Sequence, residues 1–583
     1  MPTSLEILGF SAATSALLRY LAPSHSIGLF LTTFTLYITL WTSSAIWAIL
    51  VYPRFFSPLR DIPTPPDNHW FYGQTRRIMR DRNGGPQQDW EENVPNDGLI
   101  RYSMWFQERV LVTTPKVLGE VLVTKNYEFI KPRQLRNGLG RILGIGILLA
   151  EGDEHKRQRK DLMPAFAYRH VKDLYPVFWS KSNELIECLR VATSASAQPV
   201  SPEKQSPAVV AASTPNTPVH APGTIDVGHW ASRATLDIIG LSGMGRDFNS
   251  LADPSNALNK HYQAVFTPGR VGRALQILGA LLPFWLLSRL PVKRNHEMNA
   301  ASAYIKQTCR ELIQHKRKAM QEKGETSKDI LSVALSSGNF TDEELVNQMM
   351  TFLVAGHETT ATSTIWAIFL LCRHPEAQAK LRAEVRSLLP SPSSPITATQ
   401  LDSCHYLHAV CSEVLRLYSP VSMTLRIADK DATLNGHFIP ADTTIILAPW
   451  ATNNSKKLWG EDAHEFKPER WLDADGKANN KGGADSNFSF LTFLHGPRRY
   501  TTPYPPPRSI LIAVHLLTKV ISCIGQKFAQ AEFACIVAAW VGTFETTFEE
   551  NSPLATGEPE IKGGITSKPK GGLWVNLKEV PGW

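Results

Sequence analysis

The stretch TDEELVNQMMTFLVAGHETTATSTIWAIFLLCRHP, residues 341–375 of this 583-residue chain, decides the fold. Thr341 and Glu344 have the spacing of a capping box, which starts a helix, and Pro375 cannot continue one. The residues between them are mostly apolar, as in a buried helix. At 1.5 Å per residue this helix would be about 48 Å long. We therefore expect it to cross an entire domain as its central helix.

A glycine and several polar residues interrupt this apolar helix in AGHETT, residues 355–360. A glycine inside a helix costs about 1 kcal/mol relative to alanine, so the interruption indicates a functional site. Gly356 would let another group approach the helix closely, and Glu358 and Thr359 would form a proton path into an apolar pocket. The structural alternative is a kink in which the threonines hydrogen-bond to helix carbonyls.

A second helix is predicted over residues 401–418, where Glu413 and Arg416 stand three positions apart and share a face. Most such pairs are solvated and stabilise a protein by less than about 1 kcal/mol. Downstream, FKPERW (residues 466–471) offers a second arginine, Arg470, which could complete a buried and fully paired triad.

The sequence predicts little β-structure. ATL (432–434), an Asn-Gly turn and HFI (437–439) have the pattern of a hairpin, and TTIILA (443–448) has that of a nearby strand. Helical patterns dominate the remaining sequence, so the fold is expected to be mainly α with small β-sheets.

Composition restricts the class of protein. Hydrophobic residues make up 43% of the chain and no polar linker divides it, so we expect one large catalytic domain. The net charge of +8 is small, and the basic residues are not interleaved with aromatic ones, which argues against binding of nucleic acid. The excess favours an acidic protein partner or an anionic membrane. The 7 cysteines contain no CxxC pair and predict a cytosol-facing domain without a disulfide framework.

The N-terminal region predicts a membrane anchor. Residues 27–52 contain no charged side chain and are long enough to cross about 30 Å of hydrocarbon. No cleavage site follows, and the run exceeds the usual core of a signal peptide, so we predict a single transmembrane helix. Arg54 and Arg60, just beyond it, place the following domain on the cytoplasmic side. Residues 1–26 form a short segment that would lie along the membrane interface.

Two further segments differ in composition from the main domain, residues 67–583. The prolines of residues 53–66 predict a stiff, extended hinge that holds the domain off the bilayer. Residues 191–223, rich in Ala, Ser, Pro, Thr and Val, cannot bury enough apolar surface to fold alone. A disordered insertion is therefore predicted there.

Taken together, these motifs resemble those of the cytochrome P-450 family, the haem-thiolate monooxygenases. The resemblance covers about residues 60–583 and implies the cytochrome P-450 fold. The family's oxygen-activating helix reads (A/G)-G-x-(D/E)-T, which residues 355–359 match. Its ExxR and PER motifs are matched by Glu413, Arg416 and Arg470. The sequence is most similar in style to microsomal members from filamentous fungi.

The resemblance extends to residues that contact the haem propionates in the family. In HKRQR, residues 155–159, Arg159 matches the family's arginine. His155 replaces the usual tryptophan but could still donate a hydrogen bond. Arg426 lies where many relatives have another propionate-binding arginine, the alternative being an arginine on a surface strand.

The iron-ligand loop departs from the family pattern F-x-x-G-x-R-x-C-x-G. Phe493, Gly496 and Arg498 match its first half, and Cys523 and Gly525 match its second. Cys523 follows Phe493 by 30 positions, where the family has seven, because the 23 residues 499–521 stand between the two halves. The resemblance makes Cys523 the iron ligand, since an apolar helix follows it, and it leaves the other cysteines as core residues.

The insertion conflicts with the physical need for a compact loop, which presents one thiolate to iron and hydrogen-bonds it through backbone amides. Residues 499–521 join a proline cluster to an apolar run, which does not suit a rigid loop. We favour a translated intron of 23 codons, which keeps the reading frame. The alternatives are a damaged protein and a genuinely tolerated loop.

The resemblance implies that haem b binds between the central helix and the Cys523 loop. Glu358 and Thr359 would be the catalytic pair, and Glu413, Arg416 and Arg470 would lock the structure around the iron ligand. The expected haem contacts are His155, Arg159, Gly356, Arg426, Phe493 and Arg498.

The function implied is insertion of one oxygen atom from O2 into a lipophilic small molecule, in the biosynthesis of a fungal natural product. Electrons would come from NADPH through a separate membrane-bound reductase, with cytochrome b5 as a further donor. The protein would be a single-pass protein of the endoplasmic reticulum membrane with its catalytic domain in the cytosol. The alternatives are a catalytically silent scaffold whose haem loop is broken, and an enzyme that rearranges peroxides, although such enzymes commonly lack the acid–threonine pair.

Overall fold

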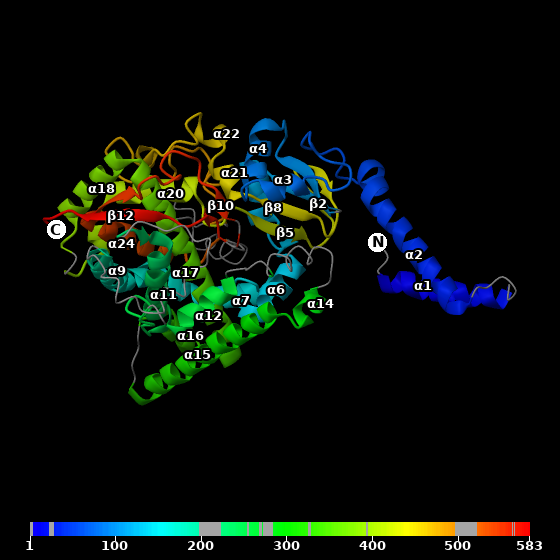
Figure 1. The fold of residues 1–583 in the computed structure, drawn as a ribbon, viewed down its shortest axis with the longest axis horizontal. Coiled ribbons are helices and arrows are strands. Elements are labelled where there is room, and N and C mark those ends of the chain that lie inside the picture. Colours follow the sequence, from blue (N-terminus) through cyan, green and yellow to red (C-terminus); the bar gives the residue numbers. More distant parts are fainter. Residues whose placement is uncertain are drawn as a thin grey trace, which may run out of the picture.

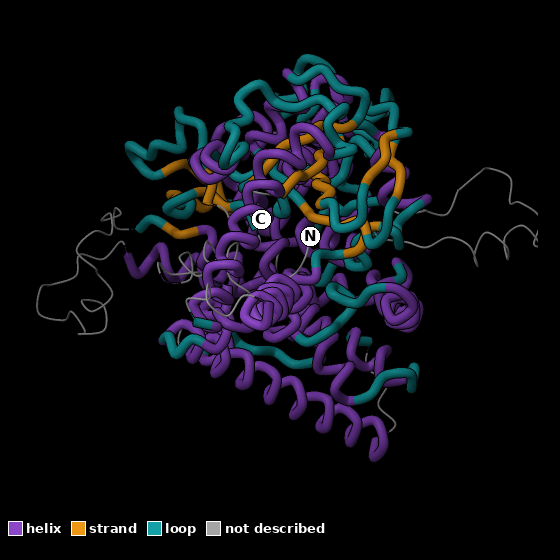
Figure 2. The backbone as a smooth tube through the Cα atoms, turned by 90° about the vertical axis from the view of Figure 1, so that its right-hand side faces the viewer, coloured by secondary structure: helices purple, strands orange, loops and turns teal. Residues whose placement is uncertain are grey.

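The computed structural model describes residues 4–21, 28–105, 107–196, 223–253, 256–266, 271, 284–323, 328–391, 394–495, 522–562, 564 and 566–583. A helix-rich part and a strand-rich part lie side by side (Figure 1), and Figure 2 shows the strands gathered above the long helices. The structure is therefore mainly α with small sheets, as the sequence predicts.

The α-helices of the main body pack into several hydrophobic clusters, one of them much larger than the others. Besides those treated below, they are α3 (Thr75–Arg80), α4 (Gly85–Asn93), α5 (Pro115–Gly119), α6 (Arg133–Leu143), α7 (Gly152–Leu162), α8 (Tyr168–Val171), α9 (Tyr175–Ser196), α11 (Val227–Met244), α12 (Ala257–Phe266), α14 (Phe284–Arg289), α15 (Lys293–Lys323), α16 (Ile330–Ser336), α18 (Pro375–Leu388), α21 (Pro449–Asn453), α22 (Lys456–Trp459) and α24 (Gln526–Thr543). Short turns of other helix types are η3 (Glu120–Thr124), η4 (Met163–Phe166), η5 (Lys172–Leu174) and η7 (Pro468–Trp471).

The central helix is α17 (Asp342–Arg373), and it is buried along most of its length. The predicted capping box is present: the backbone amide of Glu344 donates to the Thr341 hydroxyl at 3.2 Å, and the Thr341 amide donates to the Glu344 carboxylate at 2.8 Å. The helix ends just before Pro375. Helices α9, α11, α15, α20 and α24 pack around it or around its neighbours.

The second predicted helix is divided in two. A five-residue helix, α19 (Ala398–Asp402), is followed by α20 (His405–Leu417). The break comes at Ser403 and Cys404, because α19 has a capping box of its own and the backbone of Cys404 is not helical (φ −78°, ψ 80°). The prediction of one continuous helix over 401–418 was wrong, but the face shared by Glu413 and Arg416 lies within α20.

The strands form four small sheets. The largest has the order β1 (Leu99–Met104), β2 (Gln107–Val112), β8 (Thr444–Leu447), β5 (Thr424–Ala428), β3 (Phe129–Ile130), and its β2–β8 pair is parallel. The predicted hairpin is β6 (Ala432–Leu434) and β7 (His437–Ile439), joined by Asn435 and Gly436 at positive φ, as a two-residue turn requires. A three-stranded sheet has the order β4 (Ile225–Asp226), β12 (Trp574–Glu579), β9 (Phe544–Phe548). The last sheet is a hairpin of two strands, β10 (Ile561–Lys562) and β11 (Lys568–Pro569).

An N-terminal pair of helices projects from the main body (Figure 1). Helix α1 (Ser4–Leu21) packs against α2 (Leu29–Ile46), which continues into the π-helix η2 (Trp47–Phe56). The continuous helix Leu29–Phe56 is long and apolar enough to cross a membrane, and in the described residues it is the one helix of that kind. The helix therefore ends later than the predicted span 27–52, because it continues through Pro53 to Phe56.

The proline-rich segment is not an extended spacer. Its first residues belong to η2, and the side chains of Leu59 and Ile62 are buried in a core cluster beside the largest sheet. The Arg101 amide donates to the Pro63 carbonyl at 2.8 Å, and the Ser57 hydroxyl donates to the Glu108 carboxylate at 2.8 Å. The expectation of a stiff, extended hinge over residues 53–66 was wrong, because its first residues are helical and apolar side chains in this segment pack on the domain.

The first residues of the predicted insertion at 191–223 are helical. Helix α9 continues through residues 191–196, so the change in composition at 191 does not end it. Residues 197–222 lie outside the described part of the chain, and β4 follows almost at once.

Candidate active site

A fully buried carboxylate, Glu413, organises one side of the site. It accepts hydrogen bonds from Arg416 Nε and Nη2, both at 2.8 Å, and from Arg470 Nε at 2.9 Å. Trp471 Nε1 at 2.8 Å and the Lys467 amide at 3.0 Å complete its shell. The three residues predicted as a triad are therefore in contact. Trp471, the next residue of the same motif, is a further partner that was not predicted.

Arg416 uses all of its hydrogen-bonding capacity. A guanidinium group has five N–H donors. Two bind Glu413, and the others bind the backbone carbonyls of Asn453 (2.9 Å), Ala463 (2.6 Å) and Glu465 (3.1 Å). The pair thus joins α20 to the irregular segment that leads to the PER motif, which holds this segment in one position.

The two halves of the divided cysteine motif lie next to each other. The Cys523 amide donates to the Phe493 carbonyl at 2.9 Å, although 30 positions separate the two residues. Gly496, Arg498 and the insertion 499–521 lie outside the described residues. Within the described residues, Phe493 and Cys523 are therefore in direct contact despite the insertion.

The Cys523 side chain is exposed. Removal of water by the surrounding protein raises the pKa of the thiol, while the Gly525 amide and the nearby Arg159 act to lower it. Gly525 also lies near Phe166 of η4, whose ring packs edge-on against Phe352 of α17. One aromatic side chain thus bridges the cysteine loop and the central helix.

A group of basic residues lies around His155, and one of them, Arg159, is also next to this cysteine. Arg159 of α7 donates to the Ser522 carbonyl at 2.7 Å, and its Nε is buried without a hydrogen-bond partner. Arg426 of β5 is buried, so it is not a surface-strand arginine, and it donates to two acceptors of its own strand, Thr424 and Leu425. Lys131 forms an ion pair with Glu151 at 2.9 Å. The cations exceed the acidic groups here, which suits an anionic ligand.

His155 belongs to the same group and is uncharged. Burial, reinforced by Lys131 and Arg159, lowers its pKa to about 4. Its Nδ1 lies 3.1 Å from the Tyr127 hydroxyl, and burial raises the pKa of Tyr127 to about 12. Tyr127 and Lys131 were not predicted, because they lie on other segments and carry no motif.

The AGHETT turn of α17 presents different residues to different neighbours. Ala355 is exposed in the middle of this buried helix, and the Thr359 hydroxyl donates to its carbonyl at 2.7 Å, as the kink interpretation expects of the threonines. A side chain at Gly356 would instead meet Ile239 of α11, with a Cβ only 3.0 Å from its Cδ1. The group that approaches this glycine closely is therefore a helix of the protein itself.

Glu358 points to the C-terminal hairpin, which is formed by β10 and β11. It forms an ion pair with Lys568 at 2.6 Å and accepts from the Thr566 hydroxyl at 3.0 Å. Burial tends to raise the pKa of Glu358. The charge of Lys568, followed by His357 and the hydrogen bonds from Lys568 and Thr566, lowers the pKa by more than burial raises it, so the pKa lies below its usual value. Glu358 is therefore ionised at neutral pH.

A second acid near α17 was not predicted. Glu532 of α24 is fully buried and accepts from the Thr360 hydroxyl at 3.0 Å, and burial raises its pKa well above the usual value. The sequence does contain a signal for Glu532, because it is the one acidic residue in the apolar sequence AEFACIVAAW, residues 531–540.

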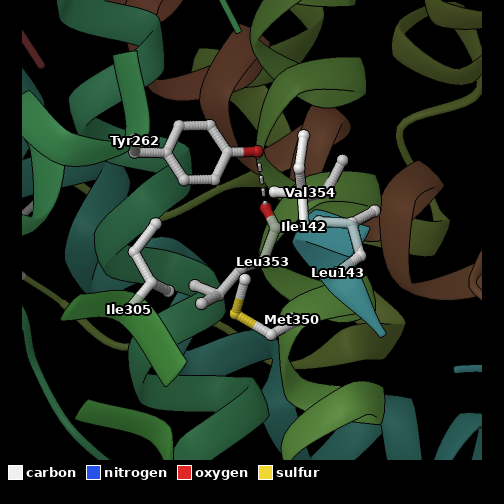
Figure 3. Close-up of a pocket in the computed structure, with 7 residues that line it drawn as sticks. All are labelled: Ile142, Leu143, Tyr262, Ile305, Met350, Leu353 and Val354. Atoms are coloured by element: carbon white, nitrogen blue, oxygen red, sulfur yellow. Dashed lines mark hydrogen bonds between the residues drawn. The ribbon is translucent and has the colours of Figure 1, made fainter. Parts of the chain in front are cut away.

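A small apolar cavity lies on another side of α17 (Figure 3). Its volume is about 10 Å³, and the Tyr262 hydroxyl donates to the Leu353 carbonyl beside it at 3.1 Å. This space holds no more than about one water molecule, so it is not a substrate pocket. Its lining residues are Ile142, Leu143, Tyr262, Ile305, Met350, Leu353 and Val354.

Comparison with known proteins decides the family. A family model described as cytochrome P450 matches residues 63–499. The chain belongs to the cytochrome P450 family. The match ends at the first residue of the insertion, which agrees with a departure from the family pattern at that point.

Curated relatives match nearly the whole of this P450. It is similar to the cytochrome P450 monooxygenase sphH of Aspergillus fumigatus, with 44% identity over 550 residues, 93% of this chain and 92% of the relative. It is also similar to the cytochrome P450 monooxygenases ALT8 of Alternaria alternata (40% identity, 92% of each chain) and FUM15 of Gibberella moniliformis (39% identity, 92% of this chain and 91% of the relative). The protein is a haem monooxygenase, and the silent scaffold is not favoured.

The described residues fit the family's cofactor, a haem iron with a thiolate ligand. An exposed thiol, an orphaned Arg159 Nε and a surplus of cations lie together, as an iron porphyrin with two carboxylates requires. The family likewise implies a redox partner and a lipophilic substrate.

Proposed function

We propose that this P450 holds haem b through Cys523 and oxidises a lipophilic intermediate of fungal secondary metabolism. The observation that supports the proposal most directly is the hydrogen bond from the Cys523 amide to the Phe493 carbonyl, because it holds the cysteine beside the first half of the motif despite the insertion. The fungal origin of the similar monooxygenases supports the metabolic role.

Each part of the site has a task in this proposal. When bound, haem supplies the activation of O2 and the insertion of one oxygen atom into a C–H bond. Cys523 would be its thiolate ligand, and the Gly525 amide would hydrogen-bond the sulfur and temper its charge. Arg159, Arg426 and neutral His155 would hold the propionates, with Arg498 as a further expected contact.

Proton supply would depend on Glu358 and Thr359. The Thr359 hydroxyl would leave the Ala355 carbonyl and donate toward the reacting oxygen, while the Glu358 carboxylate would take up protons from solvent and pass them on. Gly356 would permit the close packing of α11 that holds this turn, and Phe493 would support the cysteine loop. The Glu413–Arg416–Arg470 triad would keep the segment near the loop rigid.

The cellular setting is also part of the proposal. Helix Leu29–Phe56 would anchor the protein in the endoplasmic reticulum membrane, with Arg54 and Arg60 keeping the catalytic domain in the cytosol. Helix α1 would lie against the anchor at the interface. An NADPH-dependent reductase, with cytochrome b5 as a further donor, would dock on the basic face near Cys523 and supply electrons.

We propose further that residues 499–521 are a translated intron, a view supported by the end of the family match at residue 499. The test is a carbon monoxide difference spectrum of reduced membranes containing either the full chain or the chain without residues 499–521. A red-shifted thiolate band in the shortened form alone supports both proposals. A band in both forms overturns the intron proposal, and a band in neither overturns the haem-thiolate assignment.

A further inference from the structure

The catalytic acid is held by a lysine from a distant part of the chain. Lys568 Nζ lies 2.6 Å from Glu358 Oε1, and the Thr566 hydroxyl donates to the same oxygen at 3.0 Å. The side chain of Glu358 is 17% exposed and that of Lys568 30%, so water screens this ion pair less than one on the surface. Two bonds on one carboxylate oxygen also orient the group toward the hairpin.

The backbone next to Lys568 is fixed to the core. The Ser567 carbonyl accepts from Trp366 Nε1 at 2.8 Å, two turns further along α17, and the Ser567 amide donates to the Pro420 carbonyl at 2.9 Å. Lys568 itself pairs with Lys562 across the β10–β11 ladder. Lys568 is therefore presented to Glu358 by backbone that is fixed to the rest of the fold.

Few other charges face Glu358. His357 precedes it on α17, and Tyr262 of α12 is the other titratable neighbour. Burial lowers the pKa of His357 to about 4, and burial holds the pKa of Tyr262 well above its usual value, so both are uncharged at neutral pH. Among the residues that the structure describes, Lys568 is therefore the charged partner of this carboxylate.

We propose that Lys568 is a positioning residue for Glu358: it holds the carboxylate on the hairpin side of α17, so that this ion pair must open before Glu358 passes a proton toward Thr359. The proton comes from solvent, binds the Glu358 carboxylate once Lys568 is released, and leaves toward the site. This inference rests on the proposed role of Glu358 in proton supply.

The chain offers a matched control. Lys570, two residues along the same segment, forms an ion pair of the same length, 2.6 Å, with Glu560, but both side chains are mostly exposed and neither touches α17 in the described residues. The variants are therefore Lys568→Met, which removes the charge, Lys568→Arg, which keeps it, Lys570→Met, and Lys568→Met combined with Glu358→Gln.

The measurement is made in membranes with an NADPH-dependent reductase, on the form of the chain, with or without residues 499–521, that gives the thiolate band. A carbon monoxide difference spectrum first compares haem loading among the variants. NADPH oxidation and hydrogen peroxide formation without added substrate are then followed against pH and in D2O. Removal of an opposite charge this close raises a carboxyl pKa by about 1 unit or more. The fall of NADPH oxidation as pH rises through the pKa of Glu358, which lies below the usual 4.5 in the unmutated chain, should therefore move upward by a similar amount in Lys568→Met. Lys568→Arg and Lys570→Met should keep the original profile.

Several results would overturn the proposal. One is an unmoved pH profile in Lys568→Met with normal haem loading, and another is an equal shift in Lys570→Met. A shift that persists in the Glu358→Gln background would also exclude Glu358 as the group that Lys568 controls.

A second readout does not depend on activity. Because the pKa of Glu358 is depressed in the folded protein, the ion pair stabilises the fold at neutral pH and loses this effect as pH falls through that pKa, below the usual 4.5. The unfolding temperature of Lys568→Met should thus be lower than that of the unmutated chain at pH 7, and the difference should shrink with acid. If the unmutated chain lacks a thiolate band both with and without residues 499–521, the haem-thiolate assignment fails while this comparison still decides for or against the ion pair.

Discussion

Replacement of Arg416 by lysine tests whether the buried triad is as strongly constrained as its geometry indicates. The substitution keeps the positive charge but reduces five N–H donors to three. Arg416 is fully buried and uses all five, two on Glu413 and three on the carbonyls of Asn453, Ala463 and Glu465. At least two acceptors therefore lose a donor where water cannot replace it.

The expected cost follows from this count. A buried acceptor left without a partner costs about 1–3 kcal/mol, so Arg416→Lys should lower the free energy of unfolding by about 2–6 kcal/mol. A surface arginine provides the control: Arg317 of α15 pairs with Asp342, and about half of its side chain is exposed. Arg317→Lys should change the free energy of unfolding by less than about 1 kcal/mol.

The assay is urea unfolding of the detergent-solubilised full-length chain, followed by tryptophan fluorescence. Trp459 and Trp471 lie beside the triad and report on its surroundings. The midpoint should fall for Arg416→Lys with the denaturant slope unchanged. Equal midpoints for Arg416→Lys and Arg317→Lys would refute the reasoning, because they would mean that the orphaned carbonyls find water or new donors.

Three further predictions concern the haem site. Cys523→Ser should abolish the red-shifted carbon monoxide band, whereas Cys535→Ser should keep the band and cost only about 1–3 kcal/mol of stability for a buried hydroxyl; the two difference spectra decide this. Arg426→Ala should weaken haem binding about tenfold or more, as measured by haem titration, because a buried charge-assisted hydrogen bond to a propionate is lost. The lowered pKa of His155, about 4 against the usual 6.5, means that the unfolded chain binds more protons between these pH values, so stability should rise with pH in that window; His155→Phe should flatten this rise in thermal unfolding, and an unchanged slope would contradict a neutral His155.

Local sequence patterns predicted the elements that depend on neighbouring residues. The capping box of Thr341 and Glu344, the apolar run that follows it, and the Asn435-Gly436 turn each involve residues a few positions apart, and all three have the predicted form. The same kind of reasoning failed at Ser403 and Cys404, because α19 has its own capping box and α20 starts again after the break. It also failed for the proline segment, since its few apolar residues pack on the domain.

The sequence by itself determined the family, the mainly helical fold and the residues that could form the site, because motif spacing and hydrophobic periodicity are properties of a linear chain. Tertiary structure alone decided which distant groups meet. It places Cys523 beside Phe493 across the insertion, Tyr127 beside His155, and Lys568 beside Glu358, 210 positions apart in the chain. No local pattern marks Tyr127 or Lys568 as a partner, because a hydrogen bond or ion pair depends on distances of a few ångströms that only the packing of helices and sheets sets.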